Sequence, residues 1–269
     1  MHKLTERYRY PVILLKQLVK TDFKLRYQGS MLGYVWSLLR PLLLFVTLYA
    51  VFSYLGAGKN IQHFPQYLLL GVLLWNYFVE VTTGAVGAIV GKGDLLRKIN
   101  FPKYIIILSG SFSAFINLLL NFVVLGIFMI AGHIGLTWHA LLIIPLVFEL
   151  FVFALAMAFF LSALFVRFRD ISYIWEVIIQ MAFYATPILY KLSIIPHKFA
   201  KILILNPMAQ IIQDARYSLI DPNSQTDTIS TVYGGDHLIW VIPIGLTILL
   251  TLVAGSYFRS RSKFFAEEV

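Results

Sequence analysis

Apolar residues in this chain occur in six long runs that are separated by shorter polar connections. The runs cover approximately residues 33–55, 67–90, 104–131, 139–165, 171–190 and 238–258. One helical crossing of a bilayer needs about 20 predominantly apolar residues, and each run reaches that length. The pattern therefore predicts an all-α polytopic membrane protein with six transmembrane helices, built as a single domain over residues 1–269.

The composition agrees with this pattern and excludes several soluble classes. Hydrophobic residues make up 59% of the 269 residues and charged residues 13%, whereas globular domains carry about 25% charged residues. A soluble enzyme, a coiled coil and a disordered chain are therefore excluded. The chain contains no cysteine, which excludes disulfides, thiolate nucleophiles and cysteine-ligated metal centres.

Lysine and arginine are distributed unevenly among the connections. Sixteen of the 22 fall on the side of the predicted topology that holds both chain ends, five fall on the other side, and Arg40 lies within a run. Cytoplasmic loops are enriched in positive residues, so we expect both termini to lie in the cytoplasm. Basic cytoplasmic loops also explain the net charge of +9, and no nucleic-acid partner is expected.

A basic amphipathic pattern over residues 10–27 precedes the first run. On a helical wheel, Lys16, Lys20 and Lys24 share one side and apolar residues cover most of the other. Such a helix is typical of the membrane interface, with its apolar side in lipid and its lysines toward anionic headgroups. Asp22 falls on the apolar side and does not fit this pattern.

The connection after the second run, residues 91–104, is short, basic and amphipathic. Asp94 is placed to cap a short helix that Pro102 ends. A flexible basic connector is one interpretation, but apolar residues at 95, 96, 99 and 101 favour a helix with a docking surface for a partner.

The segment after the fifth run is long, partly apolar and interrupted by Pro187, Pro196 and Pro207. Non-helical backbone at membrane depth survives only where protein or water satisfies its polar groups. We therefore expect re-entrant half-helices over residues 188–205 and 207–220, although a plain amphipathic outer loop would also fit. The polar stretch that follows is expected to be a loop.

Motifs for catalysis or nucleotide binding are not recognisable. The glycine-rich stretch 87–93 has the wrong spacing for a phosphate-binding loop and Gly93 where the Mg²⁺-binding hydroxyl should be. If ATP drives this protein, another chain must bind it. The acidic residues in or beside the runs are scattered, so we expect no catalytic centre, no resident metal and no cofactor: Glu80, Glu149, Asp170 and Glu176.

Two charges lie inside the apolar runs, where ionisable residues are costly. Arg40 and Glu80 have similar expected depths, so we expect an intramembrane ion pair, with either a structural or a gating role. Nearby, Gly84, Gly87, Ala88 and Gly91 form small-residue pairs that favour close helix packing.

Aromatic side chains repeat at helical spacing in the first and fifth runs. Packing alone explains many such residues, but tyrosine combines an apolar ring with a hydroxyl, which suits the faces and hydroxyls of sugars. A substrate-facing stripe is therefore the second interpretation. Its candidates are Phe45, Tyr49, Phe52, Trp175, Phe183 and Tyr190.

Several motifs, in order and spacing along nearly the whole chain, resemble the permease subunits of bacterial ABC-2-type polysaccharide exporters, which move O-antigen, teichoic acid and capsular glycans. The motifs are RYQGSMLGYVWSLLRP at 26–41, LLRKINFP at 95–102, RFRD at 167–170, TPILY at 186–190 and NP at 206–207.

The resemblance implies a multi-pass subunit of the bacterial cytoplasmic (inner) membrane that pairs with a second copy of itself. It also implies two copies of a separate ATPase, which would bind ATP and Mg²⁺ and receive a coupling helix over residues 94–101. The re-entrant region would be 187–220. The coupling residues would be Asp94, Leu95, Leu96, Arg97, Lys98 and Phe101.

The cargo implied by the resemblance is a glycan linked to undecaprenyl pyrophosphate or a similar lipid, which passes an aromatic-lined channel between two permeases. Residues 10–27 would be an interfacial gate helix. The basic residues expected to attract the pyrophosphate are Lys16, Lys20, Lys24 and Arg26.

Three alternatives remain open. An ABC-2 permease could instead export a drug, a lipid or haem. An ion-coupled secondary transporter would need buried acids at an ion site and repeated halves, and a lipid-modifying enzyme would need clustered acids. The sequence displays none of these last features.

Overall fold

The described part of the chain is helical and contains no strand. The structure is a computed structural model that describes residues 2–27, 33, 35–56, 61–98, 101–220, 227–236 and 238–265, with the backbone alone described at 2–10, 23, 25–27, 95, 96 and 98. The helices are α1 (His2–Tyr27), α2 (Val35–Tyr54), α3 (Phe64–Val86), α4 (Ala88–Gly91), α5 (Gly93–Lys98), α6 (Tyr104–Ala131), α7 (Ile143–Arg167), α8 (Ile171–Ala185), α9 (His197–Ile204), α10 (Pro207–Leu219), α11 (Ile229–Val232) and α12 (Val241–Arg261), with short 3-10 turns at Trp138–Leu142, Leu192–Ile194 and Leu238–Trp240.

Five of these segments are long and apolar enough to cross a membrane. They are Val35–Tyr54, Phe64–Val86, Tyr104–Ala131, Trp138–Arg167 and Leu238–Arg261. Each lies within a few residues of a predicted run, because a polar connection or a turn ends the helix at the same place where the apolar pattern ends. The prediction of an all-α membrane protein is confirmed.

The fifth predicted run, 171–190, forms a shorter helix than its apolar pattern suggests. α8 has 15 residues and rises about 22 Å at 1.5 Å per residue, whereas the hydrocarbon core is about 30 Å thick. The helix ends because Pro187 has no amide hydrogen and pushes the residue before it toward extended backbone. Thr186 is extended accordingly, with φ −84° and ψ 137°. The sixth crossing stays a prediction.

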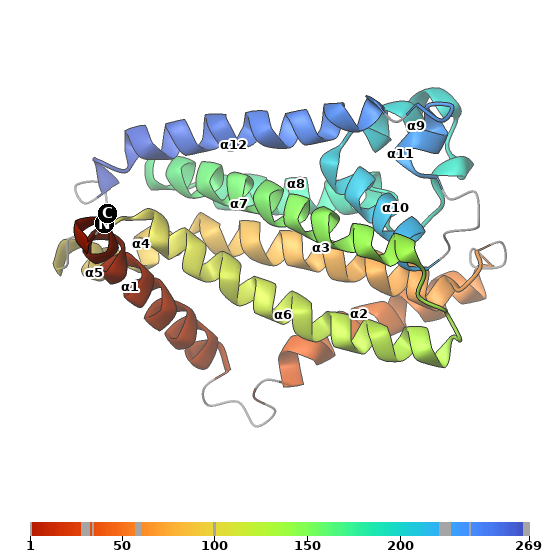
Figure 1. Cartoon of the computed structure of the whole chain (residues 1–269), viewed down its shortest axis with the longest axis horizontal. Helices are drawn as coiled ribbons and strands as arrows, with labels where there is room; N and C mark the ends of the chain where they lie inside the picture. The colour runs from red at the N-terminus through yellow and green to blue at the C-terminus, as the bar shows by residue number, and fades with distance from the viewer. Residues whose placement is uncertain are drawn as a thin grey trace.

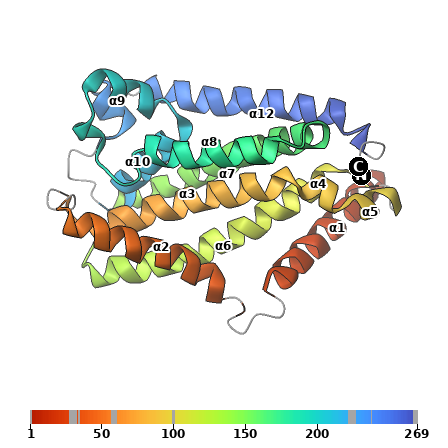
Figure 2. The ribbon, with the colours of Figure 1, turned by 180° about the vertical axis from the view of Figure 1, so that it is seen from behind.

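α3 is the central helix of the bundle. It is apolar around most of its circumference, which is the pattern of a helix buried on all sides, and 17 of its 23 residues are buried. α2, α6, α7, α8 and α10 all pack against it. In Figure 1, α6 and α7 lie in front of it and α12 runs along the edge of the bundle beside α7, and Figure 2 shows α2 and α8 on the opposite face.

The two ends of the bundle differ. The start of α1, the short helix α5 and the end of α12 meet at one end, which we call the terminal end, whereas α9, α10 and α11 gather at the other (Figure 1). α10 lies where the second half-helix, 207–220, was predicted, whereas α9 covers only the last part of the first, 188–205. Asn206 caps α10 by accepting a hydrogen bond from the Met208 amide at 3.0 Å. Whether they enter the membrane stays a prediction.

Candidate functional site

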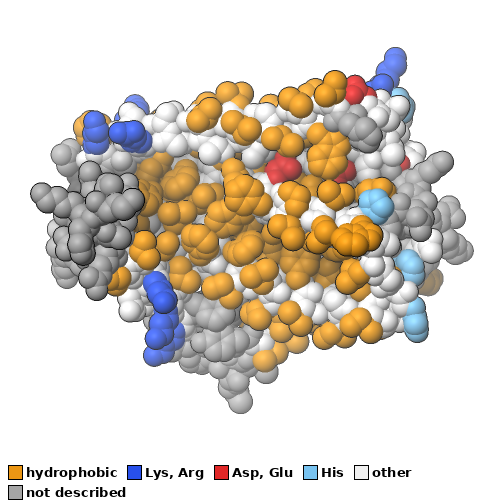
Figure 3. All heavy atoms as spheres, in the orientation of Figure 1, with side chains coloured by type: hydrophobic (Ala, Val, Ile, Leu, Met, Phe, Trp, Pro, Cys, Tyr) orange, Lys and Arg blue, Asp and Glu red, His pale blue; other side chains and the backbone are white. Residues whose placement is uncertain are grey.

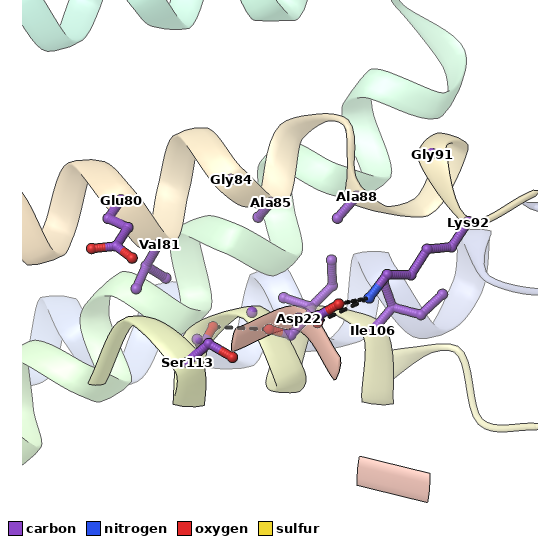
Figure 4. A pocket seen from close by; sticks show the side chains of 13 residues that line it. Asp22, Glu80, Val81, Gly84, Ala85, Ala88, Gly91, Lys92, Ile106 and Ser113 are labelled. Carbon is purple, nitrogen blue, oxygen red and sulfur yellow. Dashed lines mark hydrogen bonds and ion pairs between the residues drawn. The ribbon is translucent and has the colours of Figure 1, made fainter. Parts of the chain in front are cut away.

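A charged cluster joins three elements near the terminal end. Lys92, the single residue between α4 and α5, donates to Oδ1 and Oδ2 of Asp22 on α1 at 2.9 and 3.0 Å. The Ser109 hydroxyl of α6 lies 3.0 Å from Asp22 Oδ2. Figure 4 shows Asp22 and Lys92 pointing toward each other across the gap between their elements. The cluster explains why an acid lies on the apolar side of α1: that side faces the protein here.

A cavity of about 340 Å³ opens beside this cluster, between α1, α3, α4 and α6. The Asp22–Lys92 pair and Glu80 contribute charged groups to its wall (Figure 4). The rest of the wall consists mostly of small side chains: Gly84, Ala85, Ala88, Gly91, Gly110, Ser111 and Ser113. The cavity therefore has charged groups on one side and small side chains on the other.

Within the described protomer, Gly84, Gly87 and Gly91 make no close contact with a neighbouring helix. A Cβ atom added at Gly84, Gly87 or Gly91 would meet no heavy atom within 4 Å. At Gly84 and Gly91 the missing side chain leaves space for the cavity instead. Periodicity identified these residues correctly as a set, but it could not distinguish a contact from a void.

Arg40 and Glu80, both of which the structure describes, are not brought together. Glu80 accepts a hydrogen bond from Asn117 Nδ2 at 2.9 Å. Asn121 lies one helical turn after Asn117 on α6, and its Nδ2 is 3.4 Å from the Ser37 carbonyl oxygen of α2. Arg40 lies about one turn after Ser37 on α2, in the same direction along the bundle. This register separates the two charges along the bundle, and Arg40 is exposed on α2.

The lysines expected to attract a lipid headgroup are exposed along α1: Lys16, Lys20 and Lys24. The apolar side of α1 packs partly on protein rather than wholly in lipid, because Leu14, Leu15 and Leu18 contact the core. The Arg26 side chain lies outside the described residues.

The predicted coupling segment forms a helix over Gly93–Lys98. Asp94 and Arg97 are exposed on it, whereas Phe101 is 6% exposed and belongs to the core. Phe101 therefore anchors the connection rather than presenting itself for docking. The side chains of Leu95, Leu96 and Lys98 lie outside the described residues.

The aromatic side chains expected to face substrate mostly pack within the protomer. Phe45 is 3% exposed and meets Phe128 edge-on, and Tyr49 lies between Phe45 and Phe64. Phe52 is half-buried against the core.

The same is true of the aromatic set on α8. Trp175 is 7% exposed against Phe78, and Phe183 lies beside Trp75. The Tyr190 hydroxyl lies 3.0 Å from the Tyr184 carbonyl oxygen and donates to the broken end of α8.

The opposite face of α8 is exposed, and its side chains were not among the predicted site residues. It carries Tyr173, Glu176, Gln180 and Tyr184, which share one side of a helix at 100° per residue. The signal was present in the sequence, because a glutamate and a glutamine interrupt an apolar run on the same side as two tyrosines.

Arg216 of α10, one of the five basic residues that the topology assigns to the outer side, is fully buried. Its Nε donates to the Tyr67 carbonyl oxygen at 3.1 Å, and its Nη1 and Nη2 donate to those of Pro187 and Ile188 at 2.7 and 2.6 Å. The guanidinium also lies 3.5 Å from the centre of the Tyr67 ring. Arg216 thus supplies hydrogen bonds to the backbone that follows the proline break.

Comparison with known proteins agrees with this architecture. Residues 13–220 match the family model described as ABC-2 type transporter. The chain is 31% identical over 269 residues to the O-antigen export system permease protein RfbA of Myxococcus xanthus, covering 98% of each chain. It is 29% identical to the protein of that name from Klebsiella pneumoniae, covering 94% of each. It is 21% identical to the polysialic acid transport protein KpsM of Escherichia coli, covering 89% of this chain and 93% of that one.

The family match covers well over half of the chain, and the described helices give it the membrane-spanning segments that a transport subunit requires. This chain therefore belongs to the ABC-2 type transporter family and is an integral membrane permease.

Proposed function

We propose that this chain is the channel-forming half of an ATP-driven exporter that moves a lipid-linked polysaccharide across the bacterial cytoplasmic membrane. Two copies of the chain would form the path and two copies of a separate ATPase, with bound ATP and Mg²⁺, would drive it. The likeness over nearly full length to O-antigen permeases supports a glycan cargo. The distribution of Lys and Arg supports cytoplasmic termini.

The proposed transport path is supported by the side chains exposed on α2 and α8, which lie on one face of the bundle (Figure 2). Arg40, Glu176 and Gln180 are exposed there on otherwise apolar helices. Charged and polar side chains within membrane helices face the bundle interior or a water-filled cavity, because exposure to lipid is costly. A second copy would cover this face and leave a polar path between the two.

The opposite face is more apolar, although it also shows a few acidic side-chain atoms (Figure 3). Figure 3 shows hydrophobic side chains over most of the middle of the face that α6, α7 and α12 form. A wholly apolar groove, lined among others by Phe112, Phe122 and Phe148, lies between α6 and α7. Such a surface is suited to lipid.

The test is transport by the purified complex in vesicles. We expect ATP-dependent movement of an undecaprenyl-linked glycan by the permease reconstituted with its ATPase, and no movement when the ATPase is catalytically inactive. Movement of cargo by the permease alone on an ion gradient would contradict the proposal. Stimulation of ATP hydrolysis by hydrophobic drugs, without any by lipid-linked glycan, would favour the drug-exporter alternative.

Neutralising the exposed lysines of α1 is expected to weaken export while the complex still assembles. A basic residue near an anionic membrane surface contributes about 1 kcal/mol of attraction, so replacing Lys16, Lys20 and Lys24 by glutamine should weaken binding of a pyrophosphate headgroup by up to about 100-fold. The measurement is the export rate at limiting substrate.

The control is Lys198→Gln, an exposed lysine of α9 at the other end of the bundle. It should leave the rate unchanged. An unaltered rate in the triple variant would remove α1 from headgroup recognition.

A further inference from the structure

Lys92 connects α5 to α1: it directly precedes α5 and forms an ion pair with Asp22 of α1. α4 ends at Gly91 and α5 begins at Gly93, so Lys92 directly precedes the first residue of α5. Both partners are about one-quarter exposed, which leaves the pair accessible enough to rearrange. A charge-assisted contact through both carboxylate oxygens is among the stronger polar contacts between side chains.

The remaining contact of Asp22 can be released at low cost. The Ser109 hydroxyl lies 3.0 Å from Asp22 Oδ2 and 2.9 Å from the Ile106 carbonyl oxygen of its own helix. If α1 moves away, Ser109 keeps a hydrogen-bond acceptor and is not left unsatisfied in the interior. The hydrogen bond between Ser109 and Asp22 therefore holds α1 less strongly than the Asp22–Lys92 ion pair does.

The cavity gives α1 and its neighbours room to move. It adjoins the ion pair, and its wall is formed largely by residues whose missing side chains leave open space, such as Gly84 and Gly91. The cavity of about 340 Å³ lies open beside the quarter-exposed ion pair, so α1 can shift there without displacing tightly packed side chains.

The other flank of α5 is held more firmly. Lys103 donates to the Ser262 carbonyl oxygen after α12 and lies over the ring of Phe265. Phe265 is fully buried and packs on Phe258, which in turn packs on Phe159 of α7. A push on α5 is therefore expected to displace the Lys92 flank more than the Lys103 flank.

We propose that the Asp22–Lys92 ion pair is the link through which docking of the ATPase on α5 displaces α1. Asp22 and Lys92 act as positioning residues: they touch no substrate and move the helix that bears the headgroup-binding lysines. This inference rests on the proposed function, because that function supplies the partner that pushes on α5.

The experiment measures the position of α1 directly. The chain contains no cysteine, so single cysteines at exposed Gln17 of α1 and Leu119 of α6 can carry spin labels without further changes. In the complex with its ATPase, we expect the Gln17–Leu119 distance distribution to shift when ATP is trapped. Asp22→Asn should abolish that shift and lower glycan export at least 10-fold, while ATP hydrolysis without glycan continues.

Conservative and control variants distinguish coupling from simple stability. Lys92→Arg retains the charge pair and should retain the shift, and exchanging the two charges (Asp22→Lys with Lys92→Asp) should restore part of it. Lys198→Met should leave both shift and export unchanged. If Asp22→Asn prevents assembly, Lys92→Met is measured in its place.

A shift that persists in assembled Asp22→Asn, or the absence of any shift in the unaltered complex, overturns the proposal. The distance measurement needs no glycan. A shift that depends on Asp22 in a complex that moves no glycan would therefore refute the proposed cargo and leave the link standing.

Discussion

Replacing Arg216 by methionine is expected to destabilise the protomer by about 3 kcal/mol or more, one of the largest effects of any single change in this chain. The substitution removes the guanidinium hydrogen bonds to the buried carbonyl oxygens of Tyr67, Pro187 and Ile188, of which that of Pro187 keeps a longer bond from Gln213 Nε2 at 3.3 Å. A hydrogen bond to a charged group contributes about 1.5–3 kcal/mol, and Arg216 is fully buried, so bulk water does not reach the carbonyl oxygens to replace it. The measurement is thermal unfolding of the purified protein in one fixed detergent.

Arg216→Lys separates charge from geometry. A lysine keeps the positive charge, but its ammonium is a single point and does not match three carbonyls as the planar guanidinium fork does. We expect a stability between those of the unaltered protein and Arg216→Met. Equal stability of the lysine variant and the unaltered protein would show that charge alone matters at this site.

Gly71 provides an independent test of the same contact. A Cβ atom at Gly71 would lie 2.5 Å from Arg216 Nη2, so Gly71→Ala must displace the guanidinium from its carbonyl partners. Gly126→Ala in α6 is the matched control, because nothing lies within 4 Å of a Cβ added there. If Gly71→Ala and Arg216→Met both unfold at the temperature of the unaltered protein, Arg216 does not hold the break after α8.

The apolar runs predicted the long helices well because a bilayer imposes one length and one composition on each crossing. Prolines mark the starts of the two short outer helices, since α9 begins directly after Pro196 and α10 begins at Pro207, but the predicted start of the first at residue 188 was wrong. The predicted fifth run was longer than α8, because the apolar pattern continues through Pro187 whereas the helix ends before it. An apolar residue satisfies the pattern whether or not its backbone is helical.

The polar contacts were harder to predict because they join residues far apart in the chain. Asp22 falls on the apolar side of α1, and its partners Lys92 and Ser109 lie far away in the sequence. Arg216 looked like an outer charge because its partners are backbone atoms, which carry no sequence signal. The predicted Arg40–Glu80 ion pair was wrong because the sequence gives the approximate depth of each residue but not the register between helices.

Replacing Tyr173 and Tyr184 by alanine together is expected to lower glycan export roughly 10-fold without destabilising the protomer. Both rings are exposed, at 72% and 69%, so neither contributes much to the core. If each ring stacks on a passing sugar with the strength of an aromatic contact, about 0.5–1.5 kcal/mol, losing both weakens the interaction by about 1–3 kcal/mol, and 1.4 kcal/mol corresponds to a factor of 10.

Two further variants locate the effect on the α2 and α8 face. Phe148→Ala removes a ring with 67% exposure from the apolar face and should leave export unchanged, because that side meets lipid. Trp175→Ala should instead lower the unfolding temperature, since Trp175 is buried against Phe78. ATP-dependent glycan accumulation in vesicles measures export for all of them. If Phe148→Ala reduces export and the double tyrosine variant does not, the path runs along the other side of the bundle.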